Sequence, residues 1–447
     1  MLPRKILACW IVVLAVLGTT LRSASAQTLS KLDRGRAEQM LQTIANDVEK
    51  HYYDPKMHGI DWNTQLAEYK KKLDGATSMN MALSVVAAAL DSLNDTHTFF
   101  LPPQRPYTHS FGWQIQMIGD RCFVTQVRPR SDAESKGVKL GDQVLSIDGF
   151  DLNPENLRKM KYIFNLLRPQ PSLSVVLLSP TGQQRQVDIT ARIRQFKRVM
   201  DISGQGDDGD SDIWQLIREE ETEDHLLRVR TVKLGEELMV LKLPEFSGFS
   251  NSEIWGMLKK ARDCKTLVMD LRGDPGGSED TLSQILSHLF DHDVKIGDRV
   301  ERKGTKPLMV KHNSHDQFTG KLIVLVDQNS ASASELLARV VQIEKRGIVI
   351  GDHTAGAVME AKHYDYTVGT DTVLFYGASI TEANIVMTDG KSLEHVGVTP
   401  DEIVLPSAAD LANGRDPALA RAAAIAGVKV DPQDAGKMFP YEWNPDE

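Results

Sequence analysis

The sequence has few of the residues that mark several protein classes. Three cysteines among 447 residues exclude a disulfide scaffold, and no cluster of cysteine and histidine offers ligands for a metal. Lys and Arg (52) are fewer than Asp and Glu (61), so the net charge of −9 argues against a nucleic acid held through its phosphates. Beyond the first residues, no apolar run is long enough to span a bilayer. What remains is an ordinary globular composition, 41% hydrophobic and 25% charged, in a chain too long for one domain.

The first residues have the pattern of a secretory signal peptide. Basic residues precede an apolar run from Ile6 to Leu17, and Ala24-Ser25-Ala26 forms a small-residue cleavage site. We therefore expect residues 1–26 to be removed and the mature protein to be exported, periplasmic or secreted, without a membrane association; an uncleaved anchor is the alternative. Of the two cysteines that remain, Cys122 and Cys264 fall in different predicted domains, which favours buried free thiols over a disulfide.

Different sequence patterns divide the rest of the chain. Apolar residues at three- and four-residue spacing indicate helices, and short alternating runs between glycine turns then indicate strands. After a Gly/Asp-rich stretch, near-continuous apolar runs alternate with helical patterns, as in a parallel or mixed sheet with flanking helices. We expect a helical N-terminal domain (27–103), a β-rich module (104–194), a flexible linker (195–236) and an α/β core (237–447). Late in the core, we expect two separate strands at Thr372–Phe375 and Asn384–Met387.

Two predicted strand-to-helix junctions carry residues suited to chemistry. The first, Asp270–Gly277, reads Asp-Leu-Arg-Gly-Asp-Pro-Gly-Gly, and its glycines leave backbone N–H groups uncovered, so it is either an oxyanion-binding loop or a simple tight turn. The second, Asn329–Glu335, places three serines among small residues at the start of a helix. A serine there is either a helix cap or a nucleophile with an accessible hydroxyl.

Together with Gly351-Asp352-His353-Thr354-Ala355-Gly356, these junctions resemble the carboxyl-terminal (tail-specific) processing peptidases. Tyr52–Pro55 and Leu93–Thr98 look like the helical N-terminal part of that family, and Val138–Gly149 looks like its PDZ module. The resemblance covers nearly the whole mature chain. It implies a ClpP/crotonase-like α/β protease core with an inserted β-rich PDZ module and a helical N-terminal domain. It also implies polypeptide substrates that are unfolded or C-terminally exposed and no cofactor or metal, and it leaves a homo-oligomer open.

The resemblance assigns Ser332, which precedes Ala-Ser-Glu, as the nucleophile. In the Ser/Lys members of the family the base is a lysine in Thr-x-Gly-Lys, but this chain has Ala357 at that position. Something else must therefore take the proton of the serine, because a free hydroxyl is a weak nucleophile. Lys362, five residues further on, is one alternative base.

A branch similar to the tricorn protease core uses Ser, His and Glu instead. Its histidine lies before the PDZ module and its glutamate precedes a Gly-Val-x-Pro-Asp stretch, which here match His97 and Glu394. The resemblance thus implies His97 as general base and then acid, and Glu394 as the carboxylate that orients its imidazole. Thr96 matches a hydroxyl residue beside the histidine and is expected to support it.

The remaining site residues also follow from the resemblance. The oxyanion hole combines the N–H of Ala333 with an N–H from Gly276 or Gly277. In the PDZ module, Phe111-Gly112-Trp113 forms the loop and edge strand that would bind the carboxylate and backbone of an extended peptide.

Three other readings stay open at this stage. The chain could be a catalytically inactive peptide-binding scaffold that lost the lysine, or a hydrolase of esters or other small acyl substrates with the same triad. Alternatively, the PDZ module could bind no ligand and only pack on the protease core and gate it.

Overall fold

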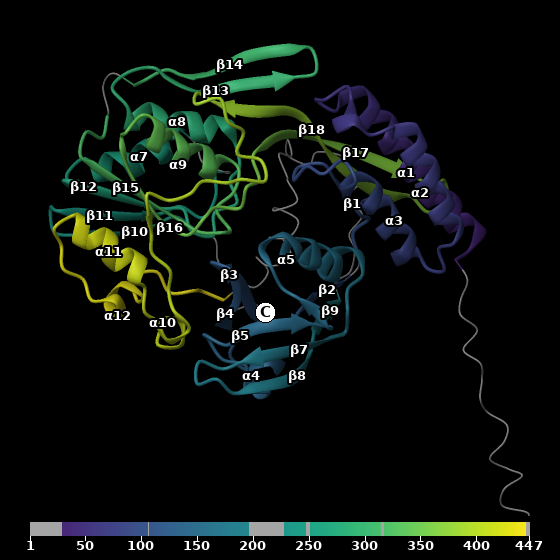
Figure 1. Cartoon of the computed structure of the whole chain (residues 1–447), viewed down its shortest axis with the longest axis horizontal. Helices are drawn as coiled ribbons and strands as arrows, with labels where there is room; N and C mark the ends of the chain where they lie inside the picture. Colours follow the sequence, from purple (N-terminus) through teal and green to yellow (C-terminus); the bar gives the residue numbers. More distant parts are fainter. Residues whose placement is uncertain (1–28, 106, 196–227, 247–250, 314–316, 444–447) are drawn as a thin grey trace, which may run out of the picture.

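A computed structural model describes residues 29–105, 107–195, 228–246, 251–313 and 317–443. The predicted signal peptide and most of the predicted linker, including its Gly/Asp-rich stretch, lie outside these residues. Three bodies are visible in Figure 1: an α/β core, a β-rich module beside it, and a group of N-terminal helices. No helix in the described part of the chain is both long and apolar enough to cross a membrane.

The core is built on a six-stranded sheet whose strands are buried on both faces. From β11 onward all neighbours are parallel, and β10 is antiparallel to β11. Alternate side chains point to opposite faces, so one face packs on α7, α8 and α9 and the other on α11. The strand order is β10 (Arg230–Leu234), β11 (Leu238–Lys242), β12 (Thr266–Asp270), β15 (Lys321–Val326), β16 (Gly347–Gly351) and β19 (Glu402–Ile403). The helices are α7 (Asn251–Ala261), α8 (Glu279–Leu289), α9 (Ala333–Ile343), α10 (Ala408–Ala412), α11 (Pro417–Ile425) and α12 (Pro432–Ala435).

A second sheet connects the core to the N-terminal helices. It consists of β1 (Phe99–Leu101), β18 (Leu374–Met387), β13 (Val294–Glu301) and β14 (Gly304–Val310), with β17 (Met359–Val368) also paired to β18. The N-terminal helices are α1 (Lys31–His51), α2 (Trp62–Asp74) and α3 (Met79–Asp91), with a short 3-10 turn at Met57–Gly59 between the first two. These helices share one hydrophobic cluster with Val368, Tyr376 and Ile380 of β17 and β18. The N-terminal helices are therefore packed on strands from the C-terminal third of the chain.

The β-rich module is a six-stranded antiparallel sheet covered by one long helix. Its strands are β3 (Trp113–Ile118), β4 (Arg121–Val127), β5 (Gln143–Ile147), β6 (Phe150–Asp151), β7 (Ser172–Leu178) and β8 (Gln184–Thr190). The short α4 (Asp132–Ser135) caps one end, and α5 (Pro154–Lys161) continues into a π-helical turn at Tyr162–Leu167. Where the chain enters and leaves, β2 (Tyr107–Ser110) pairs with β9 (Arg192–Gln195). β3 lies at one edge of the sheet.

The structure corrects two of the sequence-based expectations. The predicted linker extended to residue 236, but β10 lies inside it and pairs with β11 along its whole length. The two late strands expected at Thr372–Phe375 and Asn384–Met387 are parts of one 14-residue strand, β18, and Thr372 itself lies in the preceding turn. The expectation for the cysteines is confirmed, because Cys122 and Cys264 are buried free thiols.

Candidate active site

Ser332 occupies a strained position between β15 and α9. As the N-cap of α9 it has φ 51° and ψ −115°, a conformation that costs a non-glycine residue about 1–3 kcal/mol. Its side chain makes no capping hydrogen bond; the N–H of Glu335 donates to the Ser332 carbonyl instead, at 2.9 Å. The neighbouring serines are structural, because Ser330 Oγ donates to the Leu271 carbonyl and Ser334 Oγ to the Asp274 carbonyl. The Ser332 hydroxyl is therefore the one left available for chemistry among the three.

Glu335, which was not among the predicted site residues, connects the turn at Ser332 to the loop after β16 by hydrogen bonds. Its fully buried carboxylate accepts hydrogen bonds from the N–H of Ser332 at 3.0 Å and from the N–H groups of Gly356 and Ala357, each at 2.9 Å. It also accepts from the Thr354 hydroxyl. Burial raises the pKa of Glu335 to about 7, although these donors oppose the shift. An acidic residue three positions after an N-cap is the signature of a capping box and could have indicated this role.

The glycine loop after β12 lies directly against Ser332. A Cβ added to Gly276, whose φ is +100°, would be 2.7 Å from Ser332 Cβ and 2.9 Å from Ala333 N. The N–H of Gly276 donates to Asp274 Oδ1 at 2.8 Å. By contrast, no acceptor among the described residues takes the N–H of Gly277 or of Ala333. Of the two candidate glycines, Gly277 is thus the one whose N–H has no acceptor within the described part of the chain.

His97 lies in the loop between α3 and β1 and is connected to Glu394 through Thr96. The Thr96 hydroxyl donates to Glu394 Oε2 at 3.0 Å, and its oxygen lies 2.8 Å from His97 Nδ1. We expected the carboxylate of Glu394 to contact the imidazole directly. Instead, the Thr96 hydroxyl lies between them and connects the two groups. Because the hydroxyl proton is directed to Glu394, the Nδ1–H of His97 donates to Thr96, which leaves Nε2 unprotonated.

Two adjacent residues join the histidine side of the site to the serine side. The carbonyl of Ala357 accepts from the N–H of Ser332 at 2.9 Å, and the N–H of Val358 donates to Glu394 Oε2 at 2.9 Å. Burial raises the pKa of Glu394, while this donor and the N–H of Thr96 oppose the increase. Ser332 and the Glu394–Thr96 pair are thus both bonded to the segment Ala357–Val358. No hydrogen bond joins Ser332 to His97 directly.

The His97 imidazole is in the form that a base requires. Its Nε2 is buried and has no hydrogen-bond partner in the described part of the chain. Burial lowers the pKa of His97 to about 4, with Arg158 adding to the decrease and Asp95 opposing it. The ring is therefore neutral near pH 7 and can accept a proton.

Lys362 is not brought to this site. It is exposed on β17, and its Nζ lies 5.7 Å from the ring centroid of Tyr364. A lysine that serves as a base must reach the hydroxyl it deprotonates. The geometry therefore favours His97 over Lys362.

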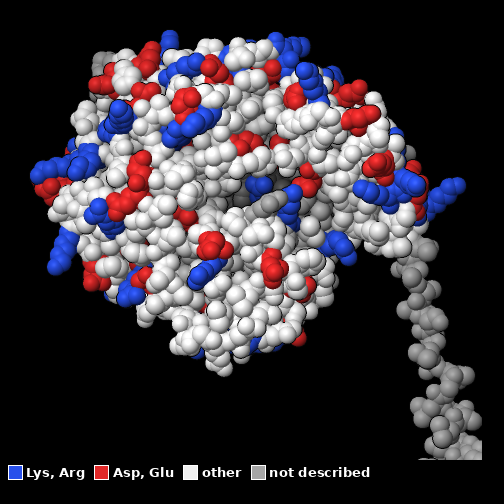
Figure 2. Space-filling model, viewed as in Figure 1, with Lys and Arg blue, Asp and Glu red and all other residues white. Residues whose placement is uncertain are grey.

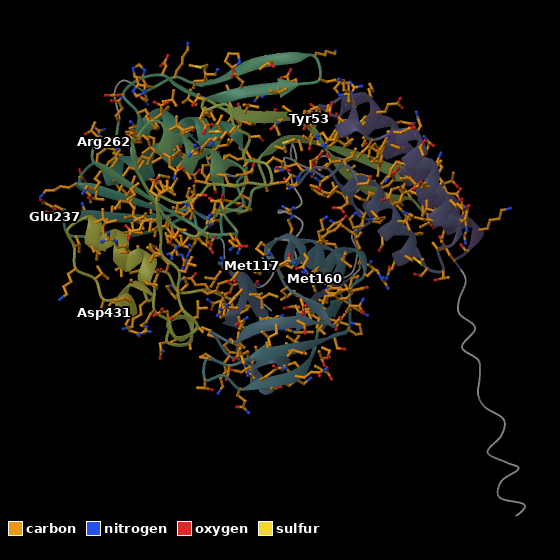
Figure 3. All side chains as sticks on the ribbon, viewed as in Figure 1. Tyr53, Met117, Met160, Glu237, Arg262 and Asp431 are labelled. Carbon is orange, nitrogen blue, oxygen red and sulfur yellow. The ribbon has the colours of Figure 1, made fainter. Side chains whose placement is uncertain are left out.

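A cleft beside the site lies between the core and the module. Its walls come from α5, from the end of α3 with the loop after it, and from the core loops that precede Ser332 and follow β16. Figure 2 shows the molecule hollowed at its centre, with basic side chains at the hollow. Met117 of β3 also lines the cleft, and Figure 3 shows Met117 and Met160 where the module faces the rest of the chain.

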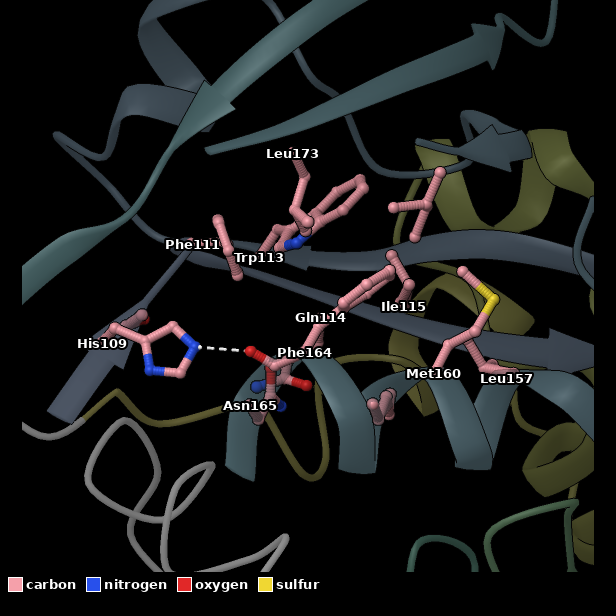
Figure 4. A pocket seen from close by; sticks show the side chains of 13 residues that line it. His109, Phe111, Trp113, Gln114, Ile115, Leu157, Met160, Phe164, Asn165 and Leu173 are labelled. Carbon is pink, nitrogen blue, oxygen red and sulfur yellow. Dashed lines mark hydrogen bonds between the residues drawn. The ribbon is translucent and has the colours of Figure 1, made fainter. Parts of the chain in front are cut away.

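A second, smaller pocket lies inside the module between β3 and α5 (Figure 4). Phe111 and Trp113 form part of its wall, whereas Gly112 does not line it and instead accepts from the N–H of Arg128 through its carbonyl, at 2.8 Å. His109 Nε2 lies 3.2 Å from the carbonyl of Phe164 across one end of the pocket. Two of the three predicted peptide-binding residues therefore border this mostly apolar groove.

The chain is similar to known proteins over most of its length. Residues 237–404 match peptidase family S41, and residues 35–80 match the tricorn protease C1 domain. Carboxyl-terminal-processing peptidase 3 of the Arabidopsis thaliana chloroplast is 23% identical over 368 residues, which cover 79% of this chain and 66% of that protein. The carboxyl-terminal-processing protease of Picosynechococcus is 24% identical over 373 residues, which cover 80% of each.

Solved structures show the same fold. Mature CPAF complexed with lactacystin superposes with a TM-score of 0.61 at 16% identity, over 86% of this chain and 96% of that one. A crystal structure of mature CPAF gives a TM-score of 0.62 at 15% identity, over 86% of this chain and 95% of that one. At this identity the likeness concerns the mixed α/β architecture alone.

Proposed function

Because the chain belongs to peptidase family S41 and is a serine-type peptidase, we propose that it cleaves unfolded or C-terminally exposed polypeptides with Ser332 as nucleophile and His97 as base. One observation carries the proposal: the hydrogen-bonded series from Glu394 through Thr96 to His97 leaves Nε2 unprotonated and without a partner. That is the state in which an imidazole can take the proton of a serine hydroxyl.

In the proposed reaction, His97 Nε2 accepts the proton of Ser332 Oγ while Oγ attacks the carbonyl carbon of the scissile peptide bond. The imidazolium then gives this proton to the leaving amine, and an acyl-enzyme on Ser332 results. A water molecule, deprotonated by the same nitrogen, releases the acid product. Throughout, Glu394 and Thr96 keep the Nδ1–H of His97 in place, so the ring presents Nε2 to the serine.

We assign the oxyanion to the N–H groups of Ala333 and Gly277. Both donors lack an acceptor among the described residues, and the neighbouring Gly276 lies against Ser332. The Ala333 N–H is also in the first turn of α9, where the helix dipole favours negative charge. Donors of this kind typically contribute 10²–10³ in kcat, or about 3–4 kcal/mol.

The substrate class follows from the module, which we propose is a PDZ module. Among the described residues, its edge strand β3 is paired on one side only, and its other side lies next to the groove with α5; strand addition needs such an edge. An extended C-terminal peptide would pair with β3 near Trp113, and its carboxylate would bind at the turn around Gly112. Curated relatives carry the name of carboxyl-terminal-processing enzymes, in agreement with substrates of this kind. We further propose, from the leader pattern, that the protein acts outside the cytoplasm.

The test is cleavage of an unstructured peptide with a free C-terminus by wild type, Ser332→Ala, His97→Ala and Lys362→Ala. We expect the first two variants to lose at least about 10³-fold in kcat/KM, and Lys362→Ala to match the wild type. A matched small ester is assayed in parallel.

Each unexpected result has a defined meaning. Full activity of His97→Ala refutes the assignment of the base, and loss in Lys362→Ala alone restores a Ser/Lys mechanism. Cleavage of the ester without the peptide identifies a small-acyl hydrolase. Peptide binding without any turnover in the wild type identifies a scaffold.

A further inference from the structure

Asp95 organises the loop that carries His97. Its Oδ1 accepts hydrogen bonds from the N–H of His97 at 3.0 Å and from the N–H of Thr98 at 2.6 Å. The same oxygen accepts from the hydroxyl of Thr381 on β18, at 2.8 Å. One carboxylate oxygen thus ties the histidine's backbone to a strand that lies 286 positions later in the chain.

The other carboxylate oxygen of Asp95 takes no part in this backbone anchoring. Oδ2 is buried and takes none of these donors. The Asp95 carboxylate also interacts with the buried hydroxyl of Tyr52, whose pKa is raised by burial, by the negative charge of Asp95 and by a side-chain hydrogen bond with it. A buried carboxylate is destabilising by several kcal/mol unless nearby groups compensate its charge. The Oδ1 of an asparagine would accept from the same backbone N–H groups without burying a charge, so backbone anchoring alone does not explain an aspartate here.

The charged groups around His97 indicate what the negative charge of Asp95 can do during the reaction. The titratable and charged groups around its loop are Asp95, Glu394 and His395, the tyrosines Tyr52 and Tyr53 at the end of α1, and Arg158 of α5. Burial and the Arg158 charge both disfavour a positive imidazole, and Asp95 is the group that opposes them. Glu394, in contrast, already accepts from Thr96 and Val358.

We propose that Asp95 is a positioning residue whose negative charge stabilises the imidazolium that His97 becomes when it takes the proton of Ser332. Glu394 and Thr96 fix the tautomer, whereas Asp95 supplies the charge that makes the buried ring a strong enough base. The inference rests on the proposed role of His97, but its test does not require activity.

The primary test compares Asp95→Asn with the parent protein in a Ser332→Ala background. The substitution keeps an Oδ1 acceptor for the two N–H groups and places an amide where Oδ2 now faces Tyr52, so the loop keeps its anchor while the charge is lost. The pKa of His97 is followed by NMR of the labelled imidazole. We expect a decrease of about one unit or more.

Because the pKa of His97 is already about 4, the same comparison is made in an Arg158→Met background. Removal of the cation raises the pKa of His97 toward conditions where the fold is stable, and Asp95→Asn then lowers it again. In the active enzyme, Asp95→Asn should reduce kcat about 10- to 100-fold with little change in KM, and move the acid limb of kcat/KM to lower pH.

Thr381→Val is the matched control. It removes one donor to Asp95 Oδ1 and keeps the charge, so it should lower the melting temperature and leave the acid limb in place. If the pKa of His97 does not fall in Asp95→Asn in either background, the inference is wrong, whatever the activity of the variant. If His97→Ala is fully active while the pKa does fall, the electrostatic effect stands and the proposed function fails instead.

Discussion

Replacing Gly276 by alanine tests how closely the glycine loop is fitted to the nucleophile. The new Cβ would lie 2.7 Å from Ser332 Cβ, 2.8 Å from the Ala331 carbonyl oxygen and 2.9 Å from Ala333 N. Two of these atoms belong to the backbone, so no rotamer change relieves the overlap, and the loop or the serine must move. We expect about 1–2 kcal/mol from the positive φ and a further 1–3 kcal/mol, approximately, from overpacking.

Gly273→Ala is the matched control in the same loop. Gly273 also has a positive φ, +78°, but a Cβ there meets nothing within 4 Å. It should therefore lose only about 1–2 kcal/mol of unfolding free energy, from the backbone strain, and keep its activity.

The assay is kcat/KM on the peptide substrate together with thermal unfolding of both variants. A displacement of about 1 Å at the oxyanion donors costs on the order of 10²-fold in rate, so Gly276→Ala should be at least that much slower while still folded. Activity within about threefold of wild type in Gly276→Ala, or an equal loss in Gly273→Ala, would refute the fitted arrangement of this loop.

The remaining predictions concern the groups around the nucleophile and base. Thr96→Val should lower kcat about 10- to 10³-fold, because it leaves the Nδ1–H of His97 without its acceptor and removes one of the two donors to Glu394 Oε2. Thr96→Ser should restore most of the rate, and steady-state kinetics decides between these outcomes. Glu335→Gln should lower the unfolding free energy by about 2–4 kcal/mol, because an amide group then faces two N–H donors. Urea unfolding measures this loss, and an unchanged midpoint would contradict the structural role of the Glu335 hydrogen bonds. Wild-type kcat/KM should decrease only below about pH 5, since burial lowers the pKa of His97 to about 4 and the unprotonated ring is the base; an acid limb near pH 7 would contradict this sign. Ser332→Gly should abolish turnover and raise the melting temperature, because glycine adopts a positive φ without strain.

The core strands were predictable because both of their faces are buried. β11, β12, β15 and β16 read as continuous apolar runs, and the structure places them near the expected residues. β18 was not recognised as one strand because its middle contains Gly377, Ser379 and Thr381, which interrupt the apolar pattern. These residues are small or polar because β18 receives β1 and the hydroxyl of Thr98 there, contacts that only the tertiary structure defines.

For the site, the motifs carried more information than the local pattern. Ser332, His97 and Glu394 were predicted by resemblance, and their roles remain proposals that the geometry supports. The relay through Thr96 could not be predicted, because two adjacent residues give no indication of which side chain contacts a carboxylate 298 positions away. The capping-box spacing of Glu335 indicates its bond to the Ser332 N–H, but its bonds to Gly356 and Ala357, 21 and 22 positions away, are defined only by the tertiary structure.

The distribution of the site along the chain has a consequence for how small an active unit can be. Residues 237–404, which match the peptidase family, contain Ser332 and Glu394 but not His97. The loop that carries the histidine is held in place because the Thr381 hydroxyl donates to Asp95 and accepts from Thr98, and because β1 pairs with β18. β18 in turn shares its hydrophobic cluster with α1, α2 and α3. A fragment limited to the matched span would therefore lack the base and would also expose the apolar face of β17 and β18 that the N-terminal helices cover, so catalysis and stability should be lost together.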